Sequence, residues 1–101
     1  MNEQRLKGLI GLSVRAGQAV FGETACRKLA EAGQCALLLL AEDASPNAAD
    51  RYRTLSRRTG VPLLNIPAGM PEAATGRGCI AIGIRNGPFA EQIAGCLKGD
   101  N

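Results

Sequence analysis

The amino-acid sequence predicts an α/β protein, a three-layer α/β/α sandwich around a small mixed, largely parallel sheet. Three observations lead to this fold class. Residues 36–41 are apolar without alternation, which is typical of a strand buried on both faces. Two further short apolar runs follow at residues 61–66 and 79–84. Segments with helical spacing of apolar residues alternate with these runs, and this order favours helices on both faces of a sheet.

The composition is that of an ordinary globular protein, and we expect a single domain over residues 1–101. Hydrophobic residues make up 46% of the chain and aromatic residues only 3%, so aliphatic side chains must build the core. No apolar run approaches the ~18 residues of a membrane span, and the charged N-terminal segment is unlike a signal sequence. We therefore expect a cytoplasmic monomer without a membrane partner. The net charge of +3 permits nucleic-acid binding without requiring it.

The predicted elements follow directly from the spacing of apolar residues and from the residues that end helices. In order, they are a helix over residues 4–16, a strand over 19–21, a helix over 23–32, a strand over 36–41, a helix over 46–59, a strand over 61–66, a loop with one helical turn over 67–75, a strand over 79–84 and a helix over 89–97.

Apolar stripes and the residues at the helix ends support the first, second and last predicted helices. Leu6, Leu9 and Ile10 lie on one stripe of the first helix, and Gly17 ends it. Glu23 in the first turn of the second helix suits the positive end of the helix dipole. In the last helix an apolar face recurs at every fourth residue from Phe89.

The third helix has the clearest boundaries. Ser45 is a good N-cap, Pro46 fits the first helical position, and Gly60 ends the helix. Its apolar residues Ala48, Tyr52 and Leu55 should face inward. Its arginines are expected to form a solvated face that attracts polyanions only at long range; they are Arg51, Arg53, Arg57 and Arg58.

The start of the second helix is the first candidate for a binding site. Gly22 allows a ligand to approach the backbone closely, because it has no Cβ. The first N–H groups of a helix have no internal partner and lie at the positive end of the dipole, so they favour anions. Lys28 follows one to two turns later, where a cation can contact a phosphate or a guanine edge.

The residues for enzyme chemistry are sparse. The four cysteines form no CxxC pair and the chain has no histidine, so we expect no zinc site, and Cys26 has no base to activate it. Glu42 and Asp43 could hold Mg²⁺ at the end of a strand. They could equally serve the fold, with Glu42 paired to Lys28 or Arg77 and Asp43 ordering the turn. No nucleophile-elbow or phosphate-loop motif is present, so we predict a protein that is not an enzyme and has no cofactor.

Several motifs, taken in order, resemble one known family. They are Gly-Leu-Ile-Gly-Leu-Ser-Val-Arg-Ala-Gly at 8–17, the helix start from Gly22 to Lys28, Leu-Leu-Leu-Leu-Ala-Glu-Asp-Ala-Ser-Pro-Asn at 37–47, Gly-Val-Pro at 60–62 and Gly-Pro-Phe-Ala at 87–90. Nearly the whole chain resembles the ribosomal protein L-seven-Ae family, which binds kink-turn RNA, and most of all its short bacterial members of the YlxQ type. The segment Ala-Glu-Asp-Ala-Ser-Pro is the most specific part of the resemblance.

The resemblance implies an α/β/α sandwich whose second helix enters a kinked RNA at tandem sheared G·A pairs. Lys28 would then contact a guanine edge or a phosphate. Ser45 would lie where some relatives contact a flipped-out nucleotide, and the loop at Arg77 would cover that nucleotide. The candidate RNA-binding residues are Gly22, Glu23, Thr24, Arg27, Lys28, Asp43, Ser45, Arg77 and Gly78.

This chain departs from the family pattern at several positions. Thr24-Ala25 replaces an asparagine-glutamate pair that contacts purine edges, and Gln18 and Phe21 replace lysines. The loop at Arg77-Gly78 is short and lacks an apolar residue to stack on a flipped base.

Two functions remain open from the sequence. The first is a non-enzymatic RNA-binding protein that recognises a kink-turn in structured or ribosomal RNA, with the ribosome as a candidate partner. The second is a protein–protein adaptor on the same scaffold with weak or non-specific RNA binding. A salt-dependent affinity for RNA separates them, because each neutralised phosphate steepens the dependence of log K on log salt.

Overall fold

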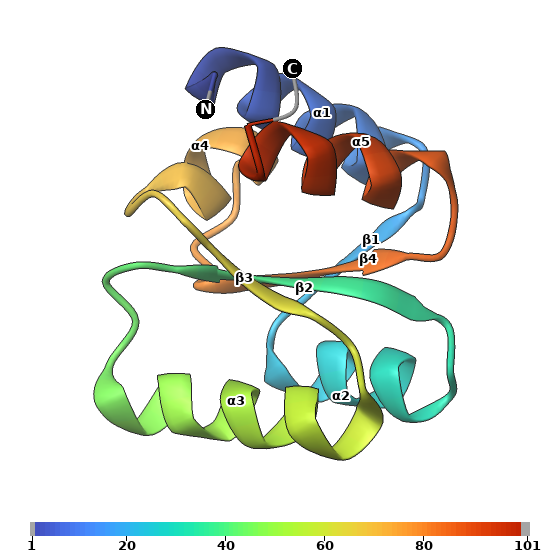
Figure 1. Ribbon diagram of the computed structural model, residues 1–101. Coiled ribbons are helices and arrows are strands. Elements are labelled where there is room, and N and C mark those ends of the chain that lie inside the picture. The colour runs from blue at the N-terminus through green and yellow to red at the C-terminus, as the bar shows by residue number, and fades with distance from the viewer. Residues whose placement is uncertain (1, 100–101) are drawn as a thin grey trace.

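In the computed structural model, which describes residues 2–99, the chain forms five helices and four strands (Figure 1). In order, they are α1 (Glu3–Arg15), β1 (Ala19–Phe21), α2 (Glu23–Glu31), β2 (Cys35–Ala41), α3 (Pro46–Thr59), β3 (Leu63–Ile66), α4 (Met70–Thr75), β4 (Ala81–Arg85) and α5 (Pro88–Leu97). All elements lie within a few residues of their predicted positions, because hydrophobic periodicity determines where the chain can bury a face.

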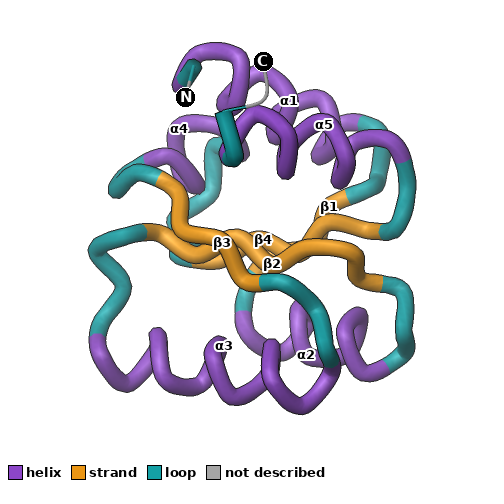
Figure 2. The backbone as a smooth tube through the Cα atoms, in the orientation of Figure 1, coloured by secondary structure: helices purple, strands orange, loops and turns teal. Residues whose placement is uncertain are grey.

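The sheet lies between two layers of helices, with α1, α4 and α5 on one face and α2 and α3 on the other (Figure 2). β2 supplies side chains to both cores. Leu37 and Leu39 pack in the core with α1 and α5, and Leu38 and Leu40 pack in the core with α2 and α3. Successive strand side chains point to opposite faces, so a doubly covered strand needs an unbroken apolar run. The predicted α/β/α sandwich is confirmed.

The strand directions correct one part of the prediction. The strand order is β1-β4-β2-β3, with β2 and β3 parallel and β4 antiparallel to both of its neighbours. The sheet is mixed, as predicted, but the expectation that it is largely parallel is wrong.

The lengths of the connecting helices explain this topology. The 14 residues of α3 span ~21 Å, which matches the ~23 Å of the seven-residue β2 and returns the chain for a parallel β3. The six residues of α4 span only ~9 Å, so the chain stays at the edge where β3 ends. Ile66 pairs with Ala41 and Ala81 pairs with Leu40, so β4 starts on the other side of β2, at the same end of the sheet where β3 ends, and runs antiparallel to β2.

The helix starts differ in their capping. Ser45 Oγ accepts a hydrogen bond of 3.2 Å from the backbone N–H of Ala48, Pro46 is the first residue of α3, and Gly60 ends it, all as predicted. The start of α1 is capped by the side chain of Asn2. No side chain caps α2, because Gly22 occupies its N-cap position.

A glycine in the middle of β4 lets α2 pack closely against the sheet. A Cβ on Gly83 would lie 3.1 Å from Cγ2 of Val20 and 3.3 Å from Sγ of Cys26. Cys26 is fully buried, and its burial, followed by the neighbouring thiols of Cys35 and Cys79, raises its pKa to about 12. Within residues 2–99 all four cysteines are free thiols.

Among the helices of the described range, none combines the length and the apolar character needed to cross a membrane.

Candidate nucleic-acid interface

The start of α2 has an exposed backbone that only glycine readily provides. Gly22 has φ 85° and ψ 164°, a region of backbone conformation restricted almost entirely to glycine. A Cβ at this position would meet no atom within 4 Å, so the space beside it is open. Since no side chain caps the helix, the first N–H groups of α2 and the positive end of its dipole are available to a ligand.

The four predicted side chains of α2 separate into two pairs. Thr24 and Lys28 are exposed and lie one turn apart, so they share one face of the helix. Glu23 and Arg27 are also one turn apart and line a groove between α2 and α3, which we call the helix groove. The floor of this groove includes Tyr52 and Leu55 of α3.

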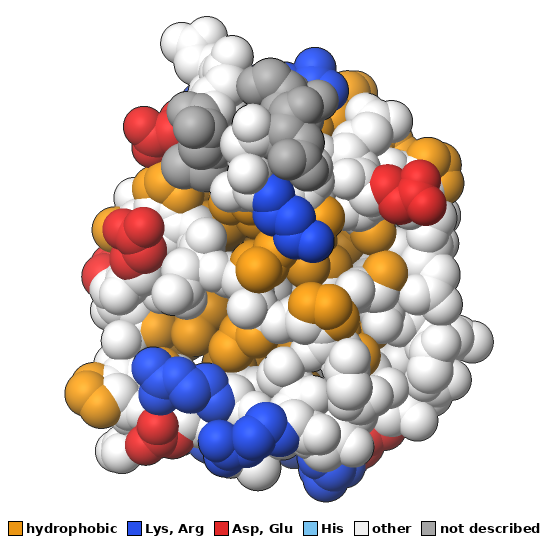
Figure 3. Space-filling model, viewed as in Figure 1, with side chains coloured by type: hydrophobic (Ala, Val, Ile, Leu, Met, Phe, Trp, Pro, Cys, Tyr) orange, Lys and Arg blue, Asp and Glu red, His pale blue; other side chains and the backbone are white. Residues whose placement is uncertain are grey.

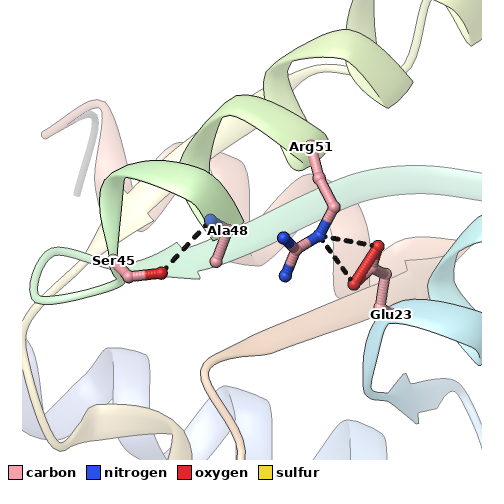
Figure 4. Close-up of polar contacts among 4 residues, drawn as sticks. All are labelled: Glu23, Ser45, Ala48 and Arg51. Carbon is pink, nitrogen blue, oxygen red and sulfur yellow. Dashed lines mark hydrogen bonds and ion pairs between the residues drawn. The ribbon is translucent and has the colours of Figure 1, made fainter.

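An ion pair joins the start of α2 to α3. Nε of Arg51 donates to both carboxylate oxygens of Glu23, at 2.9 and 3.0 Å (Figure 4). Glu23 was expected to suit the helix dipole and to be one of the RNA-binding residues, and here it is turned toward α3. Arg51 was expected on a solvated face, but it lies beside the start of α2. The terminal nitrogens of Arg51 make no hydrogen bond within residues 2–99, and in Figure 4 they lie on the side toward Ser45.

A hollow of 470 Å³ lies at the sheet edge where β2 ends and β4 begins. We call it the edge hollow. It brings together four of the predicted residues, namely Gly22, Glu23, Asp43 and Gly78. Residues that the sequence analysis did not propose complete its wall, above all Arg51, Tyr52, Pro71, Glu72, Cys79 and Ile80.

Ser45 and Arg77 lie outside the lining of the edge hollow. The hydroxyl oxygen of Ser45 caps α3, which leaves its proton free to donate. The guanidinium carbon of Arg77 lies 5.0 Å from the centroid of the Phe21 ring, a cation–π contact. Because Phe21 immediately precedes Gly22, this contact holds Arg77 near the start of α2.

The loop before β4 contains an apolar residue, Ile80, so the expectation that it lacks one is wrong. β4 begins at Ala81 rather than at residue 79, so Ile80 belongs to the loop, is 42% exposed and lines the edge hollow. Its carbonyl still accepts a hydrogen bond of 2.8 Å from the N–H of Ala41. The apolar run from residue 79 to 84 hides this boundary, since hydrophobicity alone does not show where pairing with β2 stops.

The acidic residues near the edge hollow do not gather into a cluster of metal-ligating side chains within the described range. Glu42 and Asp43 are exposed in the turn after β2, and Glu42 pairs with neither Lys28 nor Arg77, contrary to one of the roles considered for it. Across residues 2–99, no group of three or more His, Cys, Asp or Glu side chains could hold a metal ion.

The other arginines of α3 lie outside the edge hollow. Arg53 pairs with Asp50 at 2.8 Å, and Arg58 pairs with Glu31 at 2.6 Å. On the face shown in Figure 3, hydrophobic side chains gather between the helix layers, and Lys and Arg side chains lie over α3. Arg57 faces the β3 edge together with Leu63, away from the start of α2.

No family model and no curated protein matches this chain. Among solved structures it is similar to a protein of unknown function from Bacillus halodurans, with 24% identity, a TM-score of 0.86, and coverage of 92% of this chain and 96% of that one. It is also similar to the 15.5 kD RNA-binding protein of Giardia lamblia, with 17% identity, a TM-score of 0.73, and coverage of 95% and 87%. At these identities the comparisons show that the three proteins share one fold.

Proposed function

We propose that this chain is a non-enzymatic RNA-binding protein that recognises a kink-turn with tandem G·A pairs, in structured or ribosomal RNA, through the N-terminus of α2. The observation that carries the proposal is the uncapped start of α2, led by Gly22 in open space and followed by exposed Thr24 and Lys28. The Giardia protein of the same fold is described as RNA-binding, which supports RNA as the class of partner.

The physical chemistry of RNA favours such a helix end. The major groove of A-form RNA is too deep and narrow for side chains, so sequence-specific proteins bind distorted sites and unstacked bases. A kink opens the groove for the start of α2. There, the backbone N–H groups can contact a phosphate, Thr24 can hydrogen-bond a purine edge, and Lys28 can donate to guanine O6 and N7.

The edge hollow supports a complementary role at the same interface. Its carboxylates, from Glu23, Asp43 and Glu72, outnumber its one arginine, so a phosphate would be repelled from it. A base is neutral, and Pro71 and Ile80 offer apolar contact for its faces. The hollow is therefore suited to an unstacked base of the bound RNA, while Arg77 nearby can contact the backbone.

Titration of the protein against two RNA hairpins tests this proposal. One hairpin contains a kink-turn, and in the other Watson–Crick pairs replace the tandem G·A pairs, at near-physiological salt with Mg²⁺. We expect tight binding to the first hairpin alone. Lys28→Ala should raise its Kd about 5- to 150-fold, since a good contact to a guanine edge is worth ~1–3 kcal/mol. Lys7→Ala is the matched control, because Lys7 is an exposed lysine of α1 on the opposite helix layer.

Two other outcomes would contradict the proposal. Equal, salt-sensitive binding to both hairpins would indicate a general basic RNA binder. Absence of binding to either hairpin would favour the adaptor function, for which the helix groove would be the surface to examine.

A further inference from the structure

The sheet has an open edge at β3. This strand is the last in the order β1-β4-β2-β3, so within residues 2–99 it pairs with β2 alone. The carbonyl oxygens of Pro62 and Ile66 each accept a hydrogen bond of 2.9 Å from the backbone of the β2 segment. Because alternate residues of a strand direct their N–H and C=O groups to the same side, the backbone groups of Leu63 and Asn65 point away from β2. They are available to a further strand.

The devices that usually protect an edge strand do not close this one. Proteins block such edges with prolines, bulges or a covering segment. Pro62 faces β2, so its missing N–H is lost from the pairing with β2 and not from the open side. The pairing of β3 with β2 has no register shift. In Figure 1, β3 lies in front between the helix layers, and no segment of residues 2–99 crosses over it.

A positively charged groove runs beside this edge. It has a volume of 320 Å³ and lies between β3 and α3, and we call it the strand groove. Leu40 and Leu63 form its apolar part, and Arg53 and Arg57 line it one turn apart on α3, whereas no carboxylate lines it. Arg53 pairs with Asp50, but Arg57 has no ion-pair partner in the described part of the chain. The groove therefore favours a ligand with negative charge.

The two faces of β3 ask for different side chains in an added strand. Leu63 and Asn65 line the strand groove on the α3 side. Leu64 is half-buried and packs against the core with α1 and α5 on the other side. Figure 3 shows the same division, with hydrophobic side chains between the helix layers and basic side chains over α3. Since strand side chains alternate between faces, the matching strand alternates acidic and apolar residues.

We propose that the open edge of β3 binds an extended acidic segment of a partner protein, which adds to the sheet as a fifth strand. The backbone groups of Leu63 and Asn65 would hydrogen-bond its main chain, and alternate carboxylates would lie beside Arg53 and Arg57. In strand addition, main-chain hydrogen bonds supply the affinity and side-chain sites supply the specificity.

The charges favour this occupant over a second copy of the chain. Antiparallel pairing of two β3 strands would bring the arginines of both copies to the same face, where like charges repel. The surface is also distinct from the proposed RNA interface, because α2 follows β1, which forms the opposite edge of the sheet. The proposal is therefore independent of RNA binding.

The experiment measures binding of dye-labelled peptides to the full chain by fluorescence anisotropy at low salt. The probe is a peptide of about eight residues in which glutamate alternates with valine, a length within the usual range of strands. A peptide of the same composition with its glutamates grouped in one half is the control. We expect the alternating peptide to bind severalfold more tightly, and added salt to weaken its binding.

Two methylated peptides test the main-chain hydrogen bonds. One carries N-methyl groups on every glutamate of the alternating peptide, and the other carries them on every valine. Only one of these two sets of N–H groups can point toward β3, whichever way the peptide runs. One methylated peptide should therefore bind and the other should not, and the one that binds shows the direction of the added strand.

Three protein variants test the site. Arg57→Ala should raise the Kd of the alternating peptide about two- to fivefold, the effect expected of an exposed ion pair, and should leave kink-turn RNA affinity unchanged. Arg58→Ala is the matched control, since Arg58 is an exposed neighbour that does not line the strand groove. Asn65→Pro should abolish peptide binding, because it removes an N–H on the open side, where an edge strand tolerates proline. Urea unfolding shows whether this variant is folded, and the methylated peptides decide the question if it is not.

Four results would overturn the proposal. Equal binding of the alternating and grouped peptides would show that charge alone attracts them. Binding of both methylated peptides, or of neither, would contradict strand addition. A dimer that Asn65→Pro converts to a monomer would show that the edge pairs with a second copy. A loss of kink-turn RNA affinity in Arg57→Ala would assign the strand groove to RNA.

Discussion

Gly8 and Gly22 offer a direct test of why the start of α2 requires glycine. A Cβ would meet no atom within 4 Å at either position, so neither substitution by alanine causes a collision. The two glycines differ in backbone conformation, because Gly8 lies within α1 and Gly22 has φ 85° and ψ 164°. Gly8→Ala and Gly22→Ala should therefore change the free energy of unfolding in opposite directions.

The expected magnitudes follow from those conformations. A helical glycine costs about 0.5–1 kcal/mol relative to alanine, so Gly8→Ala should stabilise the protein by that amount. A side chain in the conformation of Gly22 costs about 1–3 kcal/mol, so Gly22→Ala should destabilise the protein by that amount. For a chain of this size each 1 kcal/mol moves Tm by about 4–8 °C, and the two variants should melt on either side of the wild type.

Urea titration followed by circular dichroism measures both changes. The slope of free energy against urea should be the same in all three proteins, since neither substitution alters the surface exposed on unfolding. The reasoning would be refuted if Gly22→Ala unfolded at the wild-type urea concentration, or if Gly8→Ala were the less stable variant. RNA titration of the same variants then shows whether the strain at Gly22 also displaces the interface.

Three further predictions concern the packing and the charges around the site. Arg51→Ala should weaken kink-turn RNA binding severalfold in the hairpin titration. It should change the free energy of unfolding by less than about 1 kcal/mol, because exposed ion pairs contribute little. Arg58→Ala removes the other ion pair between α2 and α3 and should leave the RNA affinity unchanged. Gly83→Ala should lower the free energy of unfolding in urea by about 1–3 kcal/mol, because its Cβ would lie 3.1 Å from Val20 and 3.3 Å from the sulfur of Cys26. Adding Cys26→Ala removes the second contact and should recover part of that loss. If the effects of the two substitutions were simply additive, the packing argument would be wrong. The raised pKa of Cys26 favours its neutral thiol in the folded state. The contribution of this thiol to stability should therefore be constant below about pH 9 and fall as pH rises toward 12, which urea midpoints at several pH values measure. Cys26→Ala should make that fall less steep.

The fold was predictable wherever one short stretch of sequence carries its own physical signal. The boundaries of α3 follow from a capping serine, a proline and a terminal glycine within a single segment. The double burial of β2 follows from an apolar run that leaves no polar face. The direction of β4 was not predictable in this way, because it depends on whether α4 is long enough to carry the chain back across the sheet.

The candidate site was predictable only in part, for a related reason. Gly22 and Lys28 stand out because a glycine followed by a polar first helical turn is a local pattern. The Glu23–Arg51 pair joins residues 28 positions apart, and nothing near Arg51 distinguishes it from the other arginines of α3. Ile80 was assigned to a strand because β4, which follows it directly, continues the same apolar character.

The sequence by itself determined the elements, the two buried faces of the sheet and the exposed glycine that begins α2, because periodicity and capping act over a few residues. The tertiary structure alone decided the strand directions and the composition of the edge hollow. The walls of that hollow come from α2, from the turn after β2, from α3, from α4 and from the segment before β4, which meet only when the strands pair into one sheet. A pocket built from distant segments has no local signature, since its chemistry arises from distances that the folded chain creates.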